Sequence, residues 1–417
     1  MRRVWIAAAG GCAALAAWGA VAAGRVAPVN PTSRPPAAAA RPVTEDYFGT
    51  KITDPYRYME DLKNPEVTGW MTAQGAYTRH VLDSIKPRAA FLERVSKFGA
   101  GFGVVVSYQT YGGRSFYLER APGADNFDLM VRDADGATRK IIDTEALRKA
   151  DGLPHAVNYY QASPDGRLIA AGVSAGGSED AALSVYDAAS GKVVAGPLAR
   201  AQFGAVAWTA DSKALTLNQL QALPAGAPRM ERYNNSAAAY WDLKGEPVEL
   251  AGAKTGRGPK LDAIQIPAMI LADGSPVAAL GATAGVQNEV SIWIAPLARM
   301  TDPAAPWRRL TTPDDGVTGG ALLGGDIYLL SHKEAPTFQV LKLAADADLG
   351  AAKAVLPARA DMVLTGIAAG RDGVYVSALE GVYSKLYRLP AAGGPAEEVA
   401  LPFKGSIVQV FADTTRD

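Results

Sequence analysis

Residues 163–174 read Ser-Pro-Asp-Gly-Arg-Leu-Ile-Ala-Ala-Gly-Val-Ser, a turn sequence that runs directly into an apolar β segment. In such turns Asp hydrogen-bonds its own backbone and Gly adopts positive φ, so neighbouring strands can reverse tightly. The pattern returns as TADSKALTLNQ at 209–219, LADGSPVAALG at 271–281 and AGRDGVYVSAL at 369–379. A second strand usually follows, as in LSVYDAASG at 183–191. Repeats of this kind, roughly 45–60 residues apart, are typical of four-stranded propeller blades.

The chain from residue 99 onwards is therefore predicted to be all-β. Residues 99–417 are long enough for a β-propeller of about seven blades, the last of them complete or incomplete. No segment of helical length and period is expected to interrupt the strands. The strands are expected at Ser115–Arg120, Leu129–Asp133, Leu168–Val173, Leu183–Asp187, Ala214–Asn218, Val277–Gly281, Val290–Ala295, Asp326–Ser331, Gln339–Leu343, Gly373–Ala378 and Lys385–Pro390.

Residues 43–98 have a different pattern, which predicts a short helical N-terminal arm. Pro65 opens one amphipathic run and a second run follows Pro87. The apolar residues of the two runs are Trp70, Met71, Tyr77, Val81, Leu82, Phe91, Leu92, Val95 and Phe98.

The first 23 residues are interpreted as a secretory signal peptide, because a basic MRR start precedes an Ala-rich apolar run. A transmembrane anchor is the alternative, but Ala and Gly insert weakly into bilayers. Cys12 lacks the large aliphatic neighbour that a lipoprotein cysteine prefers. Residues 24–42 are rich in Pro and Ala, which predicts an extended tether. The protein is expected to be exported, either periplasmic or secreted, with no membrane association after cleavage.

Composition excludes several functional classes. The 42 Lys and Arg balance 42 Asp and Glu, so there is no basic field for nucleic acid or an anionic membrane. One Cys and three His leave no material for a disulfide framework or a cysteine-built zinc site. We expect no metal and no cofactor.

The most specific sequence is N-terminal: DYFG at 46–49, DPYRYMED at 54–61, and then Trp70, Ala73 and Gln74. It resembles the start of the prolyl oligopeptidase family of serine peptidases, in which DPYRWLED is a hallmark. Tyr58 and Met59 stand where that family usually has Trp and Leu. The propeller segments QASPDGRLIAAGVSAGGSED, VAWTADSKAL and ERYNNSAAAYWDLKG also look like the family, so the resemblance runs from residue 43 to the end of the sequence.

The resemblance implies an N-terminal arm and a seven-bladed propeller that filters substrates by size. It also implies a C-terminal α/β-hydrolase domain that cleaves short peptides after proline with a Ser, Asp and His triad. This sequence shows no counterpart of that domain, so we expect a gating portion that is inactive alone. A separate α/β-hydrolase chain could supply the triad. The alternative is a non-catalytic exported propeller that binds a peptide or a protein. A carbohydrate-active propeller would need a recognisable pair of carboxylates, and none is found.

No catalytic residue is assigned. Residues 172–176, GVSAG, fit the nucleophile-elbow pattern around Ser174, but an elbow needs a helix directly after the serine. The sequence here predicts a strand and turn instead, and His332 has no motif around it. Residues 133–136, DADG, are expected to form a hairpin turn rather than a calcium loop. The pairs Asp314-Asp315 and Glu397-Glu398 are expected in solvated loops, and Trp208, Trp241, Trp293 and Trp307 are expected to pack blades.

Overall fold

The computed structural model describes residues 32–412 except Pro36. The expected signal peptide lies outside the described residues. The chain divides between Gly103 and Val104 into two compact units, and each is described by itself.

The N-terminal unit begins with a β-hairpin, β1 (Val43–Tyr47) and β2 (Thr50–Asp54). Its two-residue loop places both Phe48 and Gly49 at positive φ, the conformation that matches the twist of antiparallel strands. The Asp46 carboxylate accepts a hydrogen bond from the Gly49 amide at 2.7 Å. The expectation that the helical pattern starts at residue 43 is therefore wrong for these residues, because local turn chemistry decides their structure.

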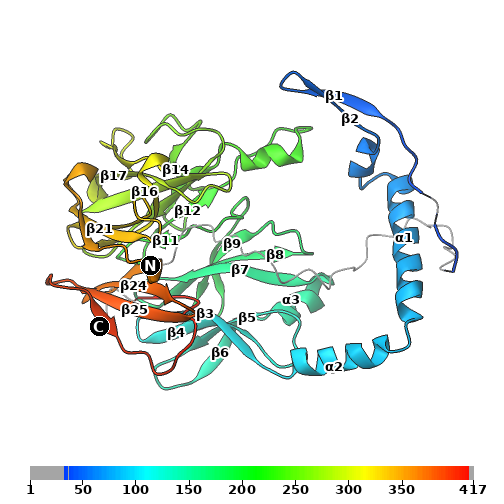
Figure 1. The fold of residues 1–417 in the computed structure, drawn as a ribbon, viewed down its shortest axis with the longest axis horizontal. Coiled ribbons are helices and arrows are strands. Elements are labelled where there is room, and N and C mark those ends of the chain that lie inside the picture. The colour runs from blue at the N-terminus through cyan, green and yellow to red at the C-terminus, as the bar shows by residue number, and fades with distance from the viewer. Residues whose placement is uncertain (1–31, 36, 413–417) are drawn as a thin grey trace. The chain divides into compact units, whose positions relative to one another are not determined.

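Two helices follow the hairpin: α1 (Pro65–Asp83) and α2 (Arg88–Ala100) (Figure 1). Asn64 caps α1 by accepting a hydrogen bond from the Glu66 amide at 2.9 Å, and Pro65 occupies the first helical position. The DPYRYMED segment forms a 3₁₀ turn, η1 (Arg57–Glu60). The Arg57 guanidinium pairs with Glu45 of the hairpin and with Glu60, so this arginine ties the turn to β1.

The described part of the second unit, residues 104–412, contains six antiparallel sheets, each of four strands consecutive in sequence. The first sheet is β3 (Val104–Tyr111), β4 (Arg114–Arg120), β5 (Asp128–Arg132) and β6 (Thr138–Ile142). The second is β7 (His155–Ala162), β8 (Leu168–Ala175), β9 (Ala182–Asp187) and β10 (Val193–Leu198). The third is β11 (Ala207–Trp208), β12 (Leu215–Gln219), β13 (Ala237–Trp241) and β14 (Val248–Gly252).

The remaining three sheets repeat this arrangement. The fourth is β15 (Gln265–Ile270), β16 (Val277–Ala284), β17 (Ser291–Pro296) and β18 (Arg308–Thr311). The fifth is β19 (Val317–Leu323), β20 (Asp326–Ser331), β21 (Gln339–Ala344) and β22 (Lys353–Leu356). The sixth is β23 (Met362–Ala369), β24 (Gly373–Glu380), β25 (Tyr383–Pro390) and β26 (Glu397–Val399).

Helical segments in this unit are short. The expectation that none interrupts the strands misses α3 (Thr144–Asp151) between β6 and β7. Its ends follow ordinary capping chemistry: the Asp143 carboxylate accepts from the Ala146 amide at 2.9 Å, and Gly152 is left-handed at φ 79°. The other helical turns are η2 (Arg229–Tyr233), η3 (Leu297–Arg299), η4 (Pro313–Asp315) and η5 (Leu349–Ala351).

Consecutive sheets pack face to face through five apolar clusters. As expected, Trp208 and Trp241 lie in the cluster between the second and third sheets, and Trp293 lies in the one between the third and fourth. Trp307 packs against the same cluster as Trp293, between the third and fourth sheets. A fully buried large apolar side chain contributes about 1.5–3 kcal/mol, so these clusters are the main source of stability. The fold is an all-β propeller.

The junction between the sixth sheet and the first is built differently. None of the five clusters contains residues of both sheets. Instead, the extended segment 400–412 passes along it: the Ser384 amide donates to the Gly405 carbonyl at 2.8 Å, and Phe411 packs edge-on against Tyr111 with ring centroids 5.2 Å apart. Six blades are present in the described residues where seven were expected, and 400–412 contains no strand.

Candidate functional site

The innermost strands of the propeller enclose a cavity of about 820 Å³. It is lined by residues of β3, β7, β15, β16, β23 and β24, by the loops that follow β8 and β10, and by 407–410 of the extended segment. This volume falls within the roughly 300–1,000 Å³ of typical ligand pockets. It is large enough to hold several residues of a peptide.

The cavity wall is almost free of charge. Glu179 is the one acidic or basic residue among the described residues that line it. The rest of the wall combines apolar side chains such as Ile266 and Ile367 with amides and hydroxyls such as Asn158, Gln202 and Thr283. A wall of this kind suits a neutral chain that needs both apolar contact and backbone hydrogen bonds.

Buried polar side chains hold the innermost strands in place. Gln109 of β3 donates to the Tyr160 carbonyl and accepts from the Ala162 amide, both at 3.2 Å, which joins the first sheet to the second. The Trp208 indole donates to the Gln161 carbonyl at 2.9 Å, joining the third sheet to the second. These bonds satisfy polar groups that would otherwise be buried at a cost. They also fix the spacing of the strands around the cavity.

Tyr159 explains the first glycine of the GVSAG motif. A Cβ built on Gly172 would lie 2.2 Å from the Tyr159 ring, and one on Gly204 would lie 2.8 Å from it. The Tyr159 hydroxyl donates to the Ala201 carbonyl at 2.5 Å, and burial raises the pKa of this phenol well above its usual value. Gly172 is therefore needed so that a tyrosine of the cavity wall can lie against the strand.

Ser174 lies inside β8, is 5% exposed and pairs with Ala156 of β7. The next strand, β9, begins at Ala182, so no helix follows the serine. His155 pairs with Ala175 instead, and adjacent residues of a strand point to opposite faces. Ser174 and His155 are therefore on opposite faces of the sheet.

The two histidines of the propeller have other partners. The His155 Nε2 atom is 2.9 Å from Asp151, and the His332 Nε2 atom is 2.9 Å from Glu289. Among the described residues, Ser174 and His332 are therefore not part of one catalytic arrangement.

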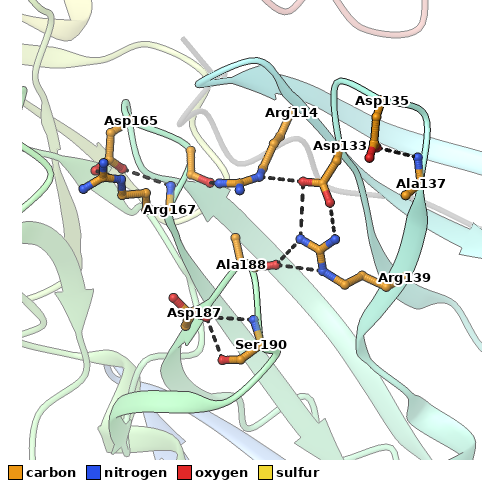
Figure 2. Close-up of polar contacts among 11 residues, drawn as sticks. Arg114, Asp133, Asp135, Ala137, Arg139, Asp165, Arg167, Asp187, Ala188 and Ser190 are labelled. Carbon is orange, nitrogen blue, oxygen red and sulfur yellow. Dashed lines mark hydrogen bonds and ion pairs between the residues drawn. The ribbon is translucent and has the colours of Figure 1, made fainter.

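The DADG turn joins β5 to β6, and its Asp133 carboxylate lies between two arginines (Figure 2). Arg114 donates to Asp133 at 2.7 Å and to the Gly166 carbonyl of the next sheet at 3.0 Å. Arg139 pairs with Asp133 and donates to the Ala188 carbonyl at 2.7 Å. The guanidinium of Arg139, followed by that of Arg114, lowers the pKa of Asp133 to about 2. This cluster clamps the first sheet to the second.

Of the two other acidic pairs, Asp314 is exposed as expected, whereas Asp315 and both glutamates have partners. Asp315 is only 17% exposed, caps η4 through Thr312 and pairs with Lys333 at 2.9 Å. Its burial corrects the expectation of a solvated loop, because the capping box draws the side chain inward. Glu397 and Glu398 lie in strand β26, not in a loop, and pair across the sheet with Arg388 and Lys385.

Residues 32–412, apart from Pro36, have neither a metal-binding cluster nor a membrane-spanning helix. They contain no group of three or more His, Cys, Asp or Glu side chains arranged to hold a metal ion. None of the described helices is both long and apolar enough to span a bilayer.

Residues 35–226 match the family model described as prolyl oligopeptidase, N-terminal beta-propeller domain. The prolyl endopeptidase of Elizabethkingia meningoseptica is 25% identical over 175 residues, covering 40% of this chain and 23% of that protein. The enzyme of Elizabethkingia miricola is 23% identical over 169 residues, with the same two shares.

Solved structures give the same result for the fold. A prolyl endopeptidase studied for its inter-domain dynamics superimposes with a TM-score of 0.76 at 22% identity, covering 89% of this chain and 53% of that one. Prolyl oligopeptidase B from Galerina marginata, bound to a 35mer substrate, gives 0.73 at 15% identity, covering 89% and 55%. All three comparisons indicate the N-terminal propeller of the prolyl oligopeptidase family. The matched part spans about a quarter of the length of the curated relatives and about half that of the solved ones.

The residues that line the cavity of this propeller were not identified from the sequence. Asn158, Tyr159 and Gln161 lie on β7, and its sequence HAVNYYQA carried the only available signal. Polar and aromatic side chains there sit directly before the SPDG turn, where an innermost strand would be expected.

Proposed function

We propose that this propeller is the substrate-gating portion of a prolyl oligopeptidase-like serine endopeptidase. The observation that carries the proposal is the nearly uncharged 820 Å³ cavity enclosed by the innermost strands. Such a space admits a short, extended, proline-containing peptide and excludes a folded protein. The Galerina enzyme bound to a 35mer supports a peptide as ligand class, because it shares this fold.

Blocking the cavity tests this proposal. Thr283→Trp places an indole on a strand that lines the cavity, whereas Thr301→Trp places the same group on an exposed turn. Isothermal titration with a neutral proline-containing hexapeptide should show binding to the wild type and to Thr301→Trp. Binding to Thr283→Trp should fall at least about tenfold. Circular dichroism would verify that both variants fold. Equal binding by Thr283→Trp would place the peptide outside the cavity and refute gating.

We also propose that the described residues cannot hydrolyse a peptide by themselves. Acyl transfer needs an activated nucleophile and oxyanion donors, and Ser174 is buried in a strand without a histidine partner. A fluorogenic Gly-Pro peptide should show no turnover with the purified 417-residue chain or with Ser174→Ala. Turnover that Ser174→Ala abolishes would overturn this proposal.

The proposal includes a seventh blade at the junction of the sixth and first sheets, with the triad carried by an α/β-hydrolase. The support is the absence of a shared apolar cluster there, together with Val105 at 55% exposure and Leu379 at 39%. We further propose export to the periplasm or medium, on the basis of residues 1–23. Fusion of these residues to a reporter, and N-terminal sequencing of the exported product, would test that step.

A further inference from the structure

A second cavity of about 240 Å³ lies beside the gating cavity. The two cavities share no lining residue, but adjacent segments line them. Glu179 and Gln202 line the large cavity, and Asp180 and Arg200 line the small one. The small cavity is below the size of typical whole-ligand pockets, so it suits one side chain or one chain end. We call it the Arg200 pocket.

The Arg200 pocket carries excess positive charge. Arg232 is 13% exposed, and its guanidinium already has a carboxylate partner, Asp180, at 2.8 Å. The Arg200 guanidinium donates only to the Leu220 carbonyl, at 2.7 Å. Among the described residues, no carboxylate lies within 4.0 Å of the Arg200 guanidinium. Arg200 is therefore a half-buried cation that lacks a counter-charge.

The surroundings of Gln221, which also lines the pocket, add to the positive charge. The Gln221 side chain accepts hydrogen bonds from Asn235 at 3.2 Å and from the Lys254 ammonium at 3.4 Å. Lys254 also lacks an ion-pair partner in the described part of the chain. Among the described residues that line the pocket, Asp180 is therefore the only carboxylate and it faces Arg232, while Arg200 is an uncompensated cation. Lys254 adds a second positive charge next to the wall, through its contact with Gln221. A carboxylate ligand would compensate this charge through charge-assisted hydrogen bonds.

Arg232 connects the two cavities. Its Nη2 atom donates to the Gln202 side chain at 2.5 Å, and Gln202 lines the gating cavity. The ring of Tyr233 lies under the Arg232 guanidinium at 5.0 Å and near Phe203 of the large cavity, with ring centroids 6.1 Å apart. The walls of the two cavities are therefore in direct contact.

We infer that the Arg200 pocket binds a carboxylate of the peptide that occupies the gating cavity. This inference rests on the proposed function and adds a substrate preference to it. The carboxylate comes either from an Asp or Glu side chain or from the peptide's C-terminus. Because the chain as a whole has no net charge, we assign the preference to this pocket rather than to a long-range positive field.

Isothermal titration with four acetylated hexapeptides tests the inference on the full chain. The reference is amidated Ala-Ala-Pro-Ala-Ala-Asn; the second peptide replaces Asn by Asp, the third is the Asn peptide with a free C-terminus, and the fourth replaces Asn by Lys. At low salt, the Asp peptide, the free-acid peptide or both should bind about tenfold more tightly than the reference, and the Lys peptide more weakly. Which of the two acidic peptides gains identifies the source of the carboxylate.

Variants locate the effect. Arg200→Gln should reduce the acidic preference, the ratio of the affinities for the acidic peptides and the amidated Asn peptide, to about twofold or less. Arg200→Lys should retain part of this preference. Arg167→Gln is the matched control, because Arg167 is 80% exposed in the turn before β8. Equal affinities for all four peptides would overturn the Arg200 pocket but leave gating intact. Failure of every peptide to bind would instead refute the proposed function. A preference that survives in Arg200→Gln would also overturn the inference.

Discussion

Replacing Asp133 by Asn should weaken the clamp between the first two sheets. The carboxylate is 23% exposed and holds Arg114 and Arg139, which in turn reach carbonyls of Gly166 and Ala188 in the second sheet. A pKa lowered from 3.8 to about 2 corresponds to roughly 2 kcal/mol, and solvent screening reduces this to about 1–2 kcal/mol. For a propeller of this size we expect the melting temperature to fall by about 2–5 °C.

The effect must depend on pH in a defined direction. A carboxylate whose pKa is lowered by folding stabilises the folded state above its unfolded pKa, and this contribution is lost as the pH falls towards the folded value. The difference in melting temperature between wild type and Asp133→Asn should therefore be full at pH 6 and shrink below about pH 4.

Asp135→Asn provides the matched control, since Asp135 lies in the same turn and accepts only from the Ala137 amide at 2.9 Å. Differential scanning fluorimetry across the pH series measures all three proteins. A loss for Asp135→Asn as large as that for Asp133→Asn, or a difference that does not change with pH, would refute the clamp.

Two further substitutions test the packing. Gly172→Ala should destabilise the propeller by about 1–3 kcal/mol in urea titrations, because the new methyl group would meet the Tyr159 ring, whereas Gly325→Ala has open space and should change little. Similar effects of both would contradict the packing role of Gly172. Arg308→Ala should cost about 1–3 kcal/mol, because Arg308 repeats the inter-sheet clamp by donating to the Ala345 and Ala347 carbonyls at 3.1 and 2.8 Å. Arg167→Ala, at an exposed arginine, is the control. If it lowers the melting temperature as much as Arg308→Ala does, Arg308 is not a specific clamp between the fourth and fifth sheets.

The sequence predicted the middle strands of the blades, except β13 of the third sheet, and missed the edges. All eleven expected segments overlap the second or third strand of a sheet, such as β8, β9, β24 and β25. These strands pair with a neighbour on each side and pack on both faces. Their sequences are therefore apolar runs that follow a turn sequence. The outer strands are short and partly exposed, as in β26, and give no such run.

The innermost strands were missed for a different reason. Four of them, β3, β7, β15 and β23, line the cavity. They carry amides, hydroxyls and small residues, as in HAVNYYQA and QIPAMI, so hydrophobic alternation is weak. The same property makes them the candidate site. Neither the cavity nor the Arg200 pocket could be predicted, because both depend on how sheets distant in sequence converge. The family resemblance, in contrast, came from local segments and needed no long-range information.

Photo-crosslinking of a bound peptide tests the central claim most directly. A neutral proline-containing hexapeptide with a central benzoylphenylalanine would be bound to the full chain, irradiated, digested and mapped by mass spectrometry. The account predicts adducts on strands that line the cavity, at positions such as Tyr159, Ile266 and Ile367. Adducts confined to the outer strands β6, β10, β14, β18, β22 and β26 would contradict a peptide-admitting cavity.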